Sequence, residues 1–122
     1  MAHLLTNRYA SKLHNTRVLL IGGTGDIGIG LAAALLEFGA SSITLSSSRR
    51  SSIDAVLSSI RTAYPDADPS RLKGYMCDLS SPQIEANLEK LFKQTGPVEH
   101  VVFLAGERLP TVPLEQLSLA LM

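Results

Sequence analysis

Two runs of four consecutive apolar residues stand out along the chain, at 18–21 and 101–104. Gly22 stops the first run, and Ala105-Gly106 stops the second. Continuous apolar runs of this length that end at glycine predict short strands buried on both faces. Shorter patterns at 43–45 and at 72–79, the latter including its exit, predict two further strands between them.

Apolar residues recur every three or four positions between the predicted strands, which predicts helices with one apolar face. The first stripe comprises Ile27, Leu31, Ala34, Leu35 and Phe38, before Gly39. The second comprises Ile53, Val56, Leu57, Ile60 and Tyr64, before Pro65. The third comprises Ile84, Leu88, Leu91 and Phe92, before Gly96-Pro97.

The third helix is preceded by Ser81-Pro82, which predicts an N-cap followed by proline at the first helical position. A last helix is expected to start near Pro113. Residues 1–16 show no clear period and are interpreted as an N-terminal tail. The regular alternation of strand and helix over 17–122 predicts one α/β domain with a parallel sheet and right-handed crossovers.

Composition narrows the class of protein. The 122 residues suit a single domain, and the formal net charge of zero excludes the basic footprint of a nucleic-acid binder. Residues 1–61 carry six basic and three acidic side chains, a net charge of +3. Residues 62–122 carry five basic and eight acidic side chains, a net charge of −3. This asymmetry favours an anionic ligand at the front half.

Cys77 is the single cysteine, so no internal disulfide can form. No apolar run approaches the roughly 18 residues needed to cross a bilayer, and we expect a cytoplasmic protein without membrane partners. We expect Cys77 to be a small buried side chain. His3, His14 and His100 are too scattered to predict a metal site.

Glycines crowd the turn after the first predicted strand. Gly23, Gly25 and Gly28 satisfy the spacing G-x-G-x-x-G, and Gly22 gives a second set with Gly25 and Gly28. Glycine allows a tight turn and close approach to a pyrophosphate, while the helix N-terminus offers free N–H groups. The context of strand, turn and helix predicts a dinucleotide site; the alternative is a glycine-rich turn kept only for packing.

The ribose end of such a site shows no acidic residue. NAD-binding units carry a carboxylate about 20 residues beyond the glycines. Counting from Gly28 reaches Ser48, and no Asp or Glu occurs within 38–53. Ser48 and Arg49 offer a hydroxyl and a guanidinium that suit a 2′-phosphate, which predicts NADP rather than NAD. The alternative is that Arg49 and Arg50 begin a solvated helix, and for Arg50 this alternative is the better one.

These motifs resemble the short-chain dehydrogenases/reductases over about residues 17–122. Residues 21–28 are similar to the family's Thr-Gly-x-x-x-Gly-x-Gly turn, and 103–106 occupy the place of its Asn-Asn-Ala-Gly segment. Ser48 and Arg49 stand where the family reads the adenosine ribose. Asp78 and Leu79 match the pair that holds the adenine, although an acid there can also simply cap a turn. The resemblance implies that the cofactor contacts are Gly22, Thr24, Gly25, Ile27, Gly28, Ser48, Arg49, Asp78, Leu79, Ala105 and Gly106.

Two positions depart from the family pattern. Asp26 stands where the family has its middle glycine. A carboxylate is favourable in the first turn of a helix but repels a neighbouring pyrophosphate. Leu104 replaces an asparagine and removes polar groups that order the fourth strand. The sequences of residues 22–24 and 75–79 most resemble those of reductases that tailor small secondary metabolites.

The family's proton transfer needs a Tyr-x-x-x-Lys pair and an upstream serine or threonine, all beyond the fourth strand. Tyr9, Tyr64 and Tyr75 precede that strand, and none has lysine four positions further on, so we name no catalytic residue. The resemblance therefore implies the cofactor-binding half of an NADP-dependent reductase for a small carbonyl or alcohol. The alternatives are an inactive dinucleotide-binding pseudoenzyme and a nonfunctional truncated product.

The resemblance also implies a Rossmann-like α/β/α fold with strand order 3-2-1-4. The strand at 101–104 is then an apolar sheet edge. Unpaired edges of this kind invite association. We therefore expect a poorly soluble chain or a partner, including a homo-oligomer.

Overall fold

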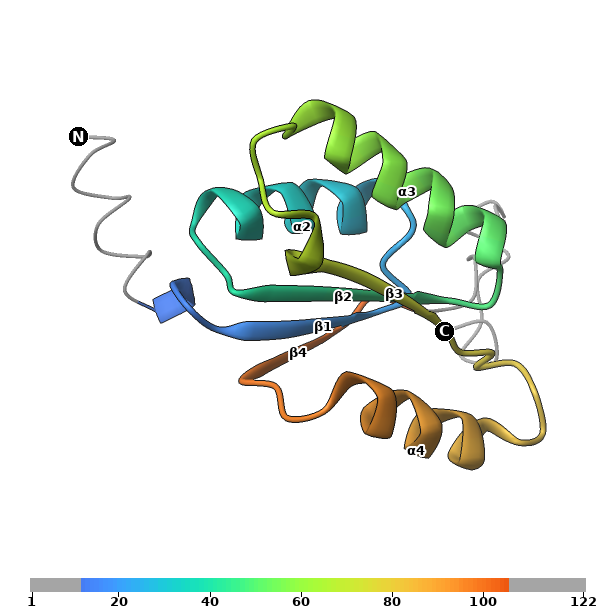
Figure 1. Cartoon of the computed structure of the whole chain (residues 1–122). Helices are drawn as coiled ribbons and strands as arrows, with labels where there is room; N and C mark the ends of the chain where they lie inside the picture. The colour runs from blue at the N-terminus through green and yellow to red at the C-terminus, as the bar shows by residue number, and fades with distance from the viewer. Residues whose placement is uncertain (1–11, 106–122) are drawn as a thin grey trace, which may run out of the picture.

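The computed structural model describes residues 12–105, which form a four-stranded sheet with helices on both faces (Figure 1). The strands are β1 (Arg17–Ile21), β2 (Ser42–Ser47), β3 (Leu72–Met76) and β4 (His100–Phe103). The helices are α2 (Asp26–Glu37), α3 (Arg50–Ala63) and α4 (Ile84–Thr95), and a 3₁₀ turn, η1, spans Pro69–Arg71. The predicted helix near Pro113 lies outside the described residues.

The strand order is β3-β2-β1-β4, and all three strand pairs are parallel. Helices α2 and α3 cover one face of the sheet and α4 lies on the other (Figure 1). The predicted α/β/α layers, parallel sheet and strand order are therefore confirmed. Because the strands are parallel, their carboxyl ends meet at one edge of the sheet, where sites of doubly wound folds form.

Strand β1 contributes to a core on each face, since successive side chains of a strand point to opposite sides. Val18 and Leu20 pack with the buried residues of α2 and α3. Leu19 and Ile21 pack with Cys77 and with Leu91 of α4. The prediction of a first strand buried on both faces is thus confirmed, and Cys77 is buried as expected.

Helix α3 follows its predicted stripe closely. Ile53, Val56, Leu57 and Ile60 are all buried against the sheet. Full burial of an aliphatic side chain stabilises a fold by about 1.5–3 kcal/mol. Gly74 of β3 allows this close packing, because a Cβ there would collide with Ile53 Cγ2.

Helix α2 buries a different face from the one that the sequence predicted. Its buried residues are Gly28, Ala32, Leu35 and Leu36, whereas Ile27 is 76% exposed. The helix is apolar on almost every side, so its pattern does not distinguish one face from the next. Contact with the sheet and with α3 fixes the face that is buried.

Helix α4 begins at Ile84 with Gln83 at the cap, later than predicted. Ser81 forms a turn instead: its hydroxyl accepts a hydrogen bond from the Gln83 amide at 3.1 Å, and its carbonyl accepts one from the Ile84 amide at 3.1 Å. This turn leads into the helix, so the prediction of Ser81 and Pro82 as its N-cap and first residue was wrong. The predicted end before Gly96 is confirmed, and Gly96 has a positive φ of 74°.

Strand β4 is largely exposed, which corrects the prediction that it is buried. Val101 is 49% exposed and Phe103 is 63% exposed. The strand pairs with β1 on one side, and within residues 12–105 no strand pairs with its other side. Helix α4 covers its face only in part, so an apolar run here marks the sheet edge.

The segment before β1 packs against the domain within its described part. Leu13 contacts the core on the α2 and α3 face. The Asn15 amide donates to the Gly39 carbonyl at 2.9 Å, and the Thr16 hydroxyl donates to the Leu13 carbonyl at 2.6 Å. None of the helices within 12–105 combines the length and apolar character that a bilayer crossing requires.

Candidate functional site

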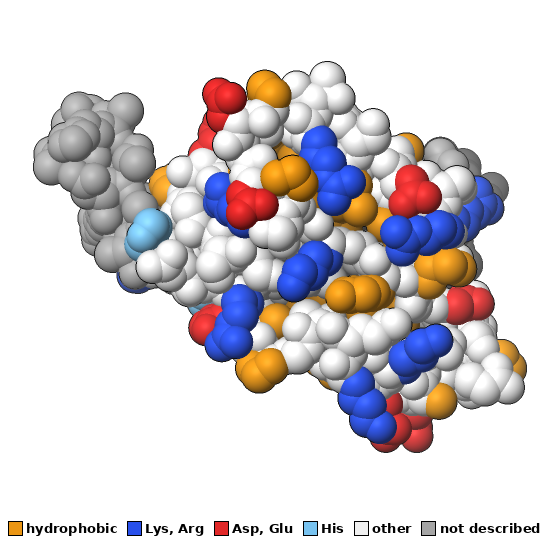
Figure 2. All heavy atoms as spheres, viewed as in Figure 1, with side chains coloured by type: hydrophobic (Ala, Val, Ile, Leu, Met, Phe, Trp, Pro, Cys, Tyr) orange, Lys and Arg blue, Asp and Glu red, His pale blue; other side chains and the backbone are white. Residues whose placement is uncertain are grey.

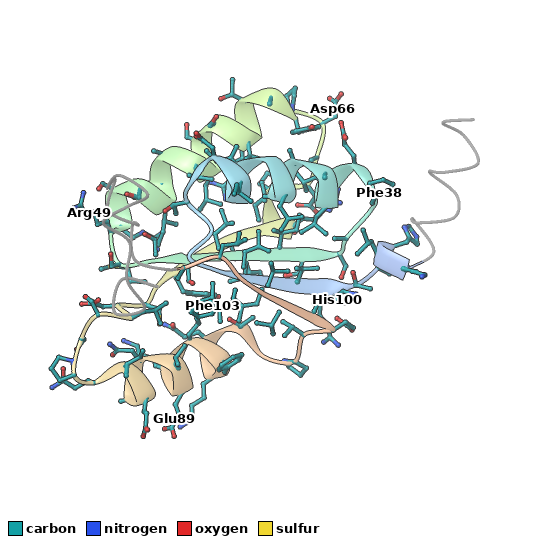
Figure 3. The ribbon with its side chains drawn as sticks, turned by 180° about the vertical axis from the view of Figure 1, so that it is seen from behind. Phe38, Arg49, Asp66, Glu89, His100 and Phe103 are labelled. Carbon is teal, nitrogen blue, oxygen red and sulfur yellow. The ribbon has the colours of Figure 1, made fainter. Side chains whose placement is uncertain are left out.

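A cleft of about 490 Å³ opens at the edge of the sheet where the parallel strands end. Its walls come from the turn after β1, the end of β2, the exit of β3 and the end of β4. Figure 3 shows Arg49 at this end of the molecule and His100, which starts β4, at the other. The predicted site residues that line the cleft are Gly22, Thr24, Ser48, Asp78, Leu79 and Ala105.

Four further predicted site residues, Gly25, Ile27, Gly28 and Arg49, are not among the residues that line the cleft. Gly25 and Ile27 are exposed at the start of α2, and Gly28 is buried beneath the turn. Arg49 is exposed and caps the start of α3. Gly106 lies outside the described residues.

The glycine turn is fastened to the end of β2. The amides of Gly22 and Gly23 both donate to the Ser46 carbonyl at 3.1 Å. Gly22 has φ +82°, which favours glycine, and a Cβ there would lie 2.6 Å from Ala105 Cβ. A Cβ at Gly28 would collide with the Gly23 carbonyl oxygen. Conformation therefore requires glycine at position 22, and packing requires it at position 28.

Gly25 is required by neither conformation nor packing. Its φ of −85° and ψ of 179° are extended values that any residue adopts. A Cβ at this position would meet nothing within 4 Å. Gly25 is the N-cap of α2, so the open space lies beside free helical amides, a location that suits a phosphate group. The turn therefore fits a dinucleotide diphosphate.

Asp26 places a negative charge next to this space. It is the first residue of α2 and is exposed. A carboxylate here stabilises the helix N-terminus, but it repels an anion bound at the same amides. The electrostatics of the turn are therefore less favourable to a diphosphate than those of a turn made of glycine alone.

The segment after β2, where the sequence predicts contact with the ribose, forms another wall of the cleft. Thr24 Oγ1 donates to Ser47 Oγ at 3.3 Å, and the Arg49 amide donates to the same oxygen at 3.4 Å. Ser48 lies between Ser47 and Arg49 in the sequence and lines the cleft. The hydroxyl of Ser48 and the guanidinium of Arg49 therefore follow directly after the anchored end of the strand.

Arg50 has a structural role that separates it from Arg49. Arg50 Nε lies 3.1 Å from Asp54 Oδ1, and its Nη1 donates to the Gly74 carbonyl at 3.1 Å. The side chain thus joins the start of α3 to β3. This agrees with the interpretation of Arg50 as part of a helix start and not of a phosphate site.

Asp78 both lines the cleft and caps the turn that follows. Its Oδ1 accepts hydrogen bonds from the Ser80 hydroxyl at 2.7 Å and the Ser80 amide at 2.9 Å. These bonds lower the pKa of Asp78 below its ordinary value, so it is anionic at neutral pH. Asn87 of α4 donates to the Asp78 carbonyl at 2.9 Å and fixes the loop. Asp78 therefore caps the turn, as the alternative interpretation predicted, and it still lines the cleft.

Cys77 lines the cleft from a buried position. Burial, followed by the charge of Asp78, raises the pKa of its thiol. A thiol held in its neutral form is a weak nucleophile. Cys77 therefore serves as an apolar part of the cleft wall.

Several lining residues were missed by the sequence motifs. Ser47, Ser80, Ile84 and Phe103 all line the cleft. Ser47 and Phe103 could have been found from their positions as the last residues of β2 and β4. Ile84 reaches the cleft because the turn at Ser81 shifts the start of α4, and no local pattern indicates this.

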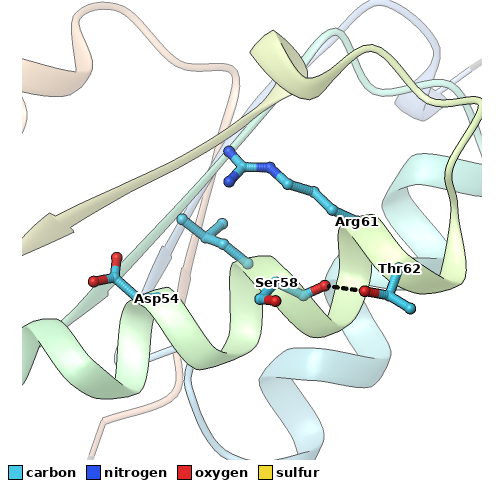
Figure 4. A pocket seen from close by; sticks show the side chains of 5 residues that line it. Asp54, Ser58, Arg61 and Thr62 are labelled. Atoms are coloured by element: carbon cyan, nitrogen blue, oxygen red, sulfur yellow. Dashed lines mark hydrogen bonds between the residues drawn. The ribbon is translucent and has the colours of Figure 1, made fainter.

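A second hollow lies on the outer side of α3, lined by Asp54, Leu57, Ser58, Arg61 and Thr62 (Figure 4). Its polar groups are engaged within the fold: Thr62 Oγ1 donates to the Ser58 carbonyl at 2.9 Å, and Arg61 Nη2 donates to the Leu72 carbonyl at 3.4 Å. This hollow is remote from the strand ends. The cleft at the strand ends is therefore the candidate site.

Charges are spread over the face seen in Figure 2, where basic side chains lie among acidic and apolar ones without forming one patch. Within residues 12–105 no group of three or more His, Cys, Asp or Glu side chains could hold a metal ion. The groups at or beside the cleft that could bind an anion are backbone amides of the glycine turn, hydroxyls and the Arg49 guanidinium.

A cleft at the carboxyl ends of parallel strands, walled by a glycine turn between β1 and α2, defines a Rossmann-type dinucleotide-binding domain. The SDR-like Rossmann domain family matches residues 9–122 of the chain. The chain belongs to the short-chain dehydrogenase/reductase family, as its motifs indicated. This fold implies a nicotinamide dinucleotide as the cofactor.

Fungal proteins are among the relatives of this chain. The short-chain dehydrogenase/reductase fsr5 of Gibberella fujikuroi is 38% identical over 116 residues, which cover 92% of this chain and 43% of fsr5. The short-chain dehydrogenase/reductase malC of Malbranchea aurantiaca is 30% identical over 119 residues, which cover 93% of this chain and 44% of malC.

The structure of the MalC reductase/Diels-Alderase from Malbranchea aurantiaca superposes with a TM-score of 0.72 at 29% identity. The superposition covers 93% of this chain and 45% of that one. The chain thus spans less than half the length of each of these relatives.

Proposed function

We propose that this chain is the cofactor-binding part of an NADP-dependent oxidoreductase that transfers hydride to or from a small carbonyl or alcohol. The bound nicotinamide would donate the hydride to a carbonyl or accept it from an alcohol. The residues of this chain would hold the adenosine and diphosphate parts of the cofactor. No catalytic residue is assigned to this chain.

The open space at Gly25 carries this proposal. Gly22 and Gly28 are explained by the fold itself, but Gly25 has neither a positive φ nor a close neighbour. A ligand that approaches the backbone closely explains a glycine that the folded chain does not need. Free amides at the start of α2 make that ligand a phosphate.

The preference for NADP rests on the charge beside the ribose. Ser48 and Arg49 follow β2, and no acidic residue lies within 38–53. A guanidinium binds a 2′-phosphate through charged hydrogen bonds, whereas a ribose 2′-hydroxyl is read by a carboxylate. At this position the chain offers a guanidinium for a 2′-phosphate and lacks a carboxylate for a 2′-hydroxyl.

A substrate from secondary metabolism is proposed from the relatives. MalC is described as a reductase/Diels-Alderase, and this chain covers 45% of it. The sequences of residues 22–24 in the turn and of the segment 75–79 resemble those of reductases of this kind. We therefore propose a small secondary metabolite as the substrate class.

An inactive dinucleotide-binding protein is the second candidate function. None of the tyrosines of this chain is followed by lysine four positions later. Such a protein would bind the cofactor through the same cleft without turnover. Turnover distinguishes the two: under the first function a longer protein that contains this chain consumes NADPH on a panel of small ketones, and under the second it does not.

Calorimetric titration of the 122-residue chain with NADPH and NADH tests the cofactor proposal. We expect tighter binding of NADPH, and the substitution Arg49→Ala should weaken it about tenfold or more, the size of a lost charged hydrogen bond. Binding of NADH should change little. Lys93→Ala, an exposed site on α4, is the matched control. Tighter NADH binding by the wild-type chain, or unchanged NADPH binding by Arg49→Ala, contradicts the assignment.

A further inference from the structure

Ser47 contacts three walls of the cleft at once. Its hydroxyl accepts hydrogen bonds from Thr24 Oγ1 at 3.3 Å and from the Arg49 amide at 3.4 Å. Its carbonyl accepts one from the Cys77 amide at 2.9 Å. One residue therefore touches the glycine turn, the ribose segment and the exit of β3.

The hydroxyl of the neighbouring Ser46 contacts the glycine turn and β1. This buried hydroxyl accepts a hydrogen bond from the Gly22 amide at 3.2 Å and donates to the Leu20 carbonyl at 3.4 Å. Side chains alternate along a strand, so Ser46 and Ser47 point to opposite faces of the sheet. Ser47 points to the face of α2 and α3, on which Arg49 begins α3.

A 2′-phosphorylated dinucleotide binds the two segments that Ser47 joins. Its diphosphate would lie at the glycine turn, and its 2′-phosphate would lie at Arg49. The covalent structure of the ligand fixes the spacing between these groups, so the two protein segments must match it. A residue that bonds to both segments sets this match in advance and lowers the cost of ordering them.

We propose that Ser47 is a positioning residue that holds the glycine turn and Arg49 at the spacing required by a 2′-phosphorylated dinucleotide. It thereby favours that cofactor over one with a free 2′-hydroxyl. This inference rests on the proposed function, since it concerns the same cleft. Ser47 acts through Thr24 and Arg49, whose groups would touch the ligand.

Removal of the hydroxyl affects the two cofactors differently. Loss of the Thr24 bond loosens the diphosphate end, which NADPH and NADH share. Loss of the Arg49 amide bond releases the ribose segment, and only NADPH depends on the guanidinium there. Ser47→Ala therefore lowers NADPH affinity more than NADH affinity, while Ser47→Thr keeps the hydroxyl and the preference.

Calorimetric titrations of the 122-residue chain with both cofactors test this role. Ser47→Ala should weaken NADPH binding by about three- to tenfold, the range of a neutral hydrogen bond, and move the NADPH-to-NADH ratio toward NADH. Ser47→Thr should restore both values. Ser46→Ala should weaken both cofactors equally, and Ser59→Ala, exposed on α3, should change neither. An unchanged ratio in Ser47→Ala overturns the inference.

Amide hydrogen exchange of the ligand-free chain separates this role from the cofactor assignment. The Arg49 amide should exchange faster in Ser47→Ala than in the wild-type chain, and it should not change in Ser46→Ala. Equal exchange rates overturn the positioning role of Ser47 whatever cofactor binds. A wild-type chain that binds neither cofactor overturns the proposed function, while faster Arg49 exchange would still support the Ser47 contact.

Discussion

Arg17 and Glu99 fasten the start of β1 to the segment that leads into β4. Arg17 Nη2 donates to Glu99 Oε1 at 2.8 Å, and the Arg17 amide donates to Glu99 Oε2 at 2.7 Å. The Glu99 amide in turn donates to the Arg17 carbonyl at 2.9 Å. This reciprocal arrangement holds the exposed edge strand in register with the centre of the sheet.

The Arg17–Glu99 contact predicts a pH-dependent stability. The hydrogen bonds from Arg17 lower the pKa of Glu99 from 4.5 to about 2. Because the pKa of Glu99 is lower in the folded chain, the Arg17–Glu99 contact contributes its full stabilisation above pH 4.5. This stabilisation is lost as the pH falls toward 2. In urea unfolding, Glu99→Gln should be less stable than the wild-type chain at pH 7, and the difference should shrink through this window. Because both side chains are substantially exposed, solvent screening keeps the effect small.

Glu89→Gln is the matched control for this prediction, because Glu89 is an exposed residue of α4. It should unfold like the wild-type chain at every pH. A difference between Glu99→Gln and the wild-type chain that is constant from pH 7 to pH 2 argues against the ion pair as its cause.

Substitution by serine should destabilise the fold at Gly28 but not at Gly25. Gly28→Ser should cost about 1–3 kcal/mol, because its Cβ would collide with the Gly23 carbonyl. The free energy of unfolding of Gly25→Ser should lie within about 0.5 kcal/mol of the wild-type value, since the new side chain enters open space and serine is a good N-cap. Gly25→Ser should nevertheless lose NADPH affinity in calorimetry. Unchanged affinity in this folded variant would place the diphosphate elsewhere.

Arg71 should stabilise the domain through the end of α2. Its Nε donates to the Ala40 carbonyl at 2.9 Å and its Nη2 to the Leu36 carbonyl at 3.0 Å. The last turn of α2 contains no basic residue of its own, so Arg71 supplies the charge that its carbonyls favour. Arg71→Met should lower the free energy of unfolding by about 1.5–3 kcal/mol, measured in urea. Lys73→Met, at an exposed position of β3, should have little effect; an equal loss there would contradict the capping role.

The edge of β4 should cause self-association. Val101 and Phe103 are exposed on a strand whose outer side pairs with no other strand of residues 12–105. Analytical ultracentrifugation should show a mass that rises with concentration. Val101→Lys should reduce this rise, because a charged side chain discourages edge pairing. Ser59→Lys adds the same charge on α3 and should not; a wild-type chain that is monomeric at all concentrations contradicts the prediction.

The sequence predicted the residues at the strand ends that line the candidate cleft, but it did not predict every residue that lines it. Gly22, Ser48 and Asp78 each follow a predicted strand, and parallel strands bring such positions together. Phe103 also follows from its place as the last residue of β4. Ile84 joins them only through the turn before α4, so its contribution depends on how that turn folds.

The sequence by itself determined the burial of β1 and the inner face of α3, because their apolar spacing leaves few ways to bury these segments. The strand order was implied by the resemblance of its motifs to a known family, and the structure confirms it. The sequence also determined where the glycines fall. Only the tertiary structure decided which face of α2 is buried and that β4 is exposed, since an apolar residue is buried only where another element covers it. The same holds for Gly25: its open space depends on what surrounds the turn, which no local pattern records.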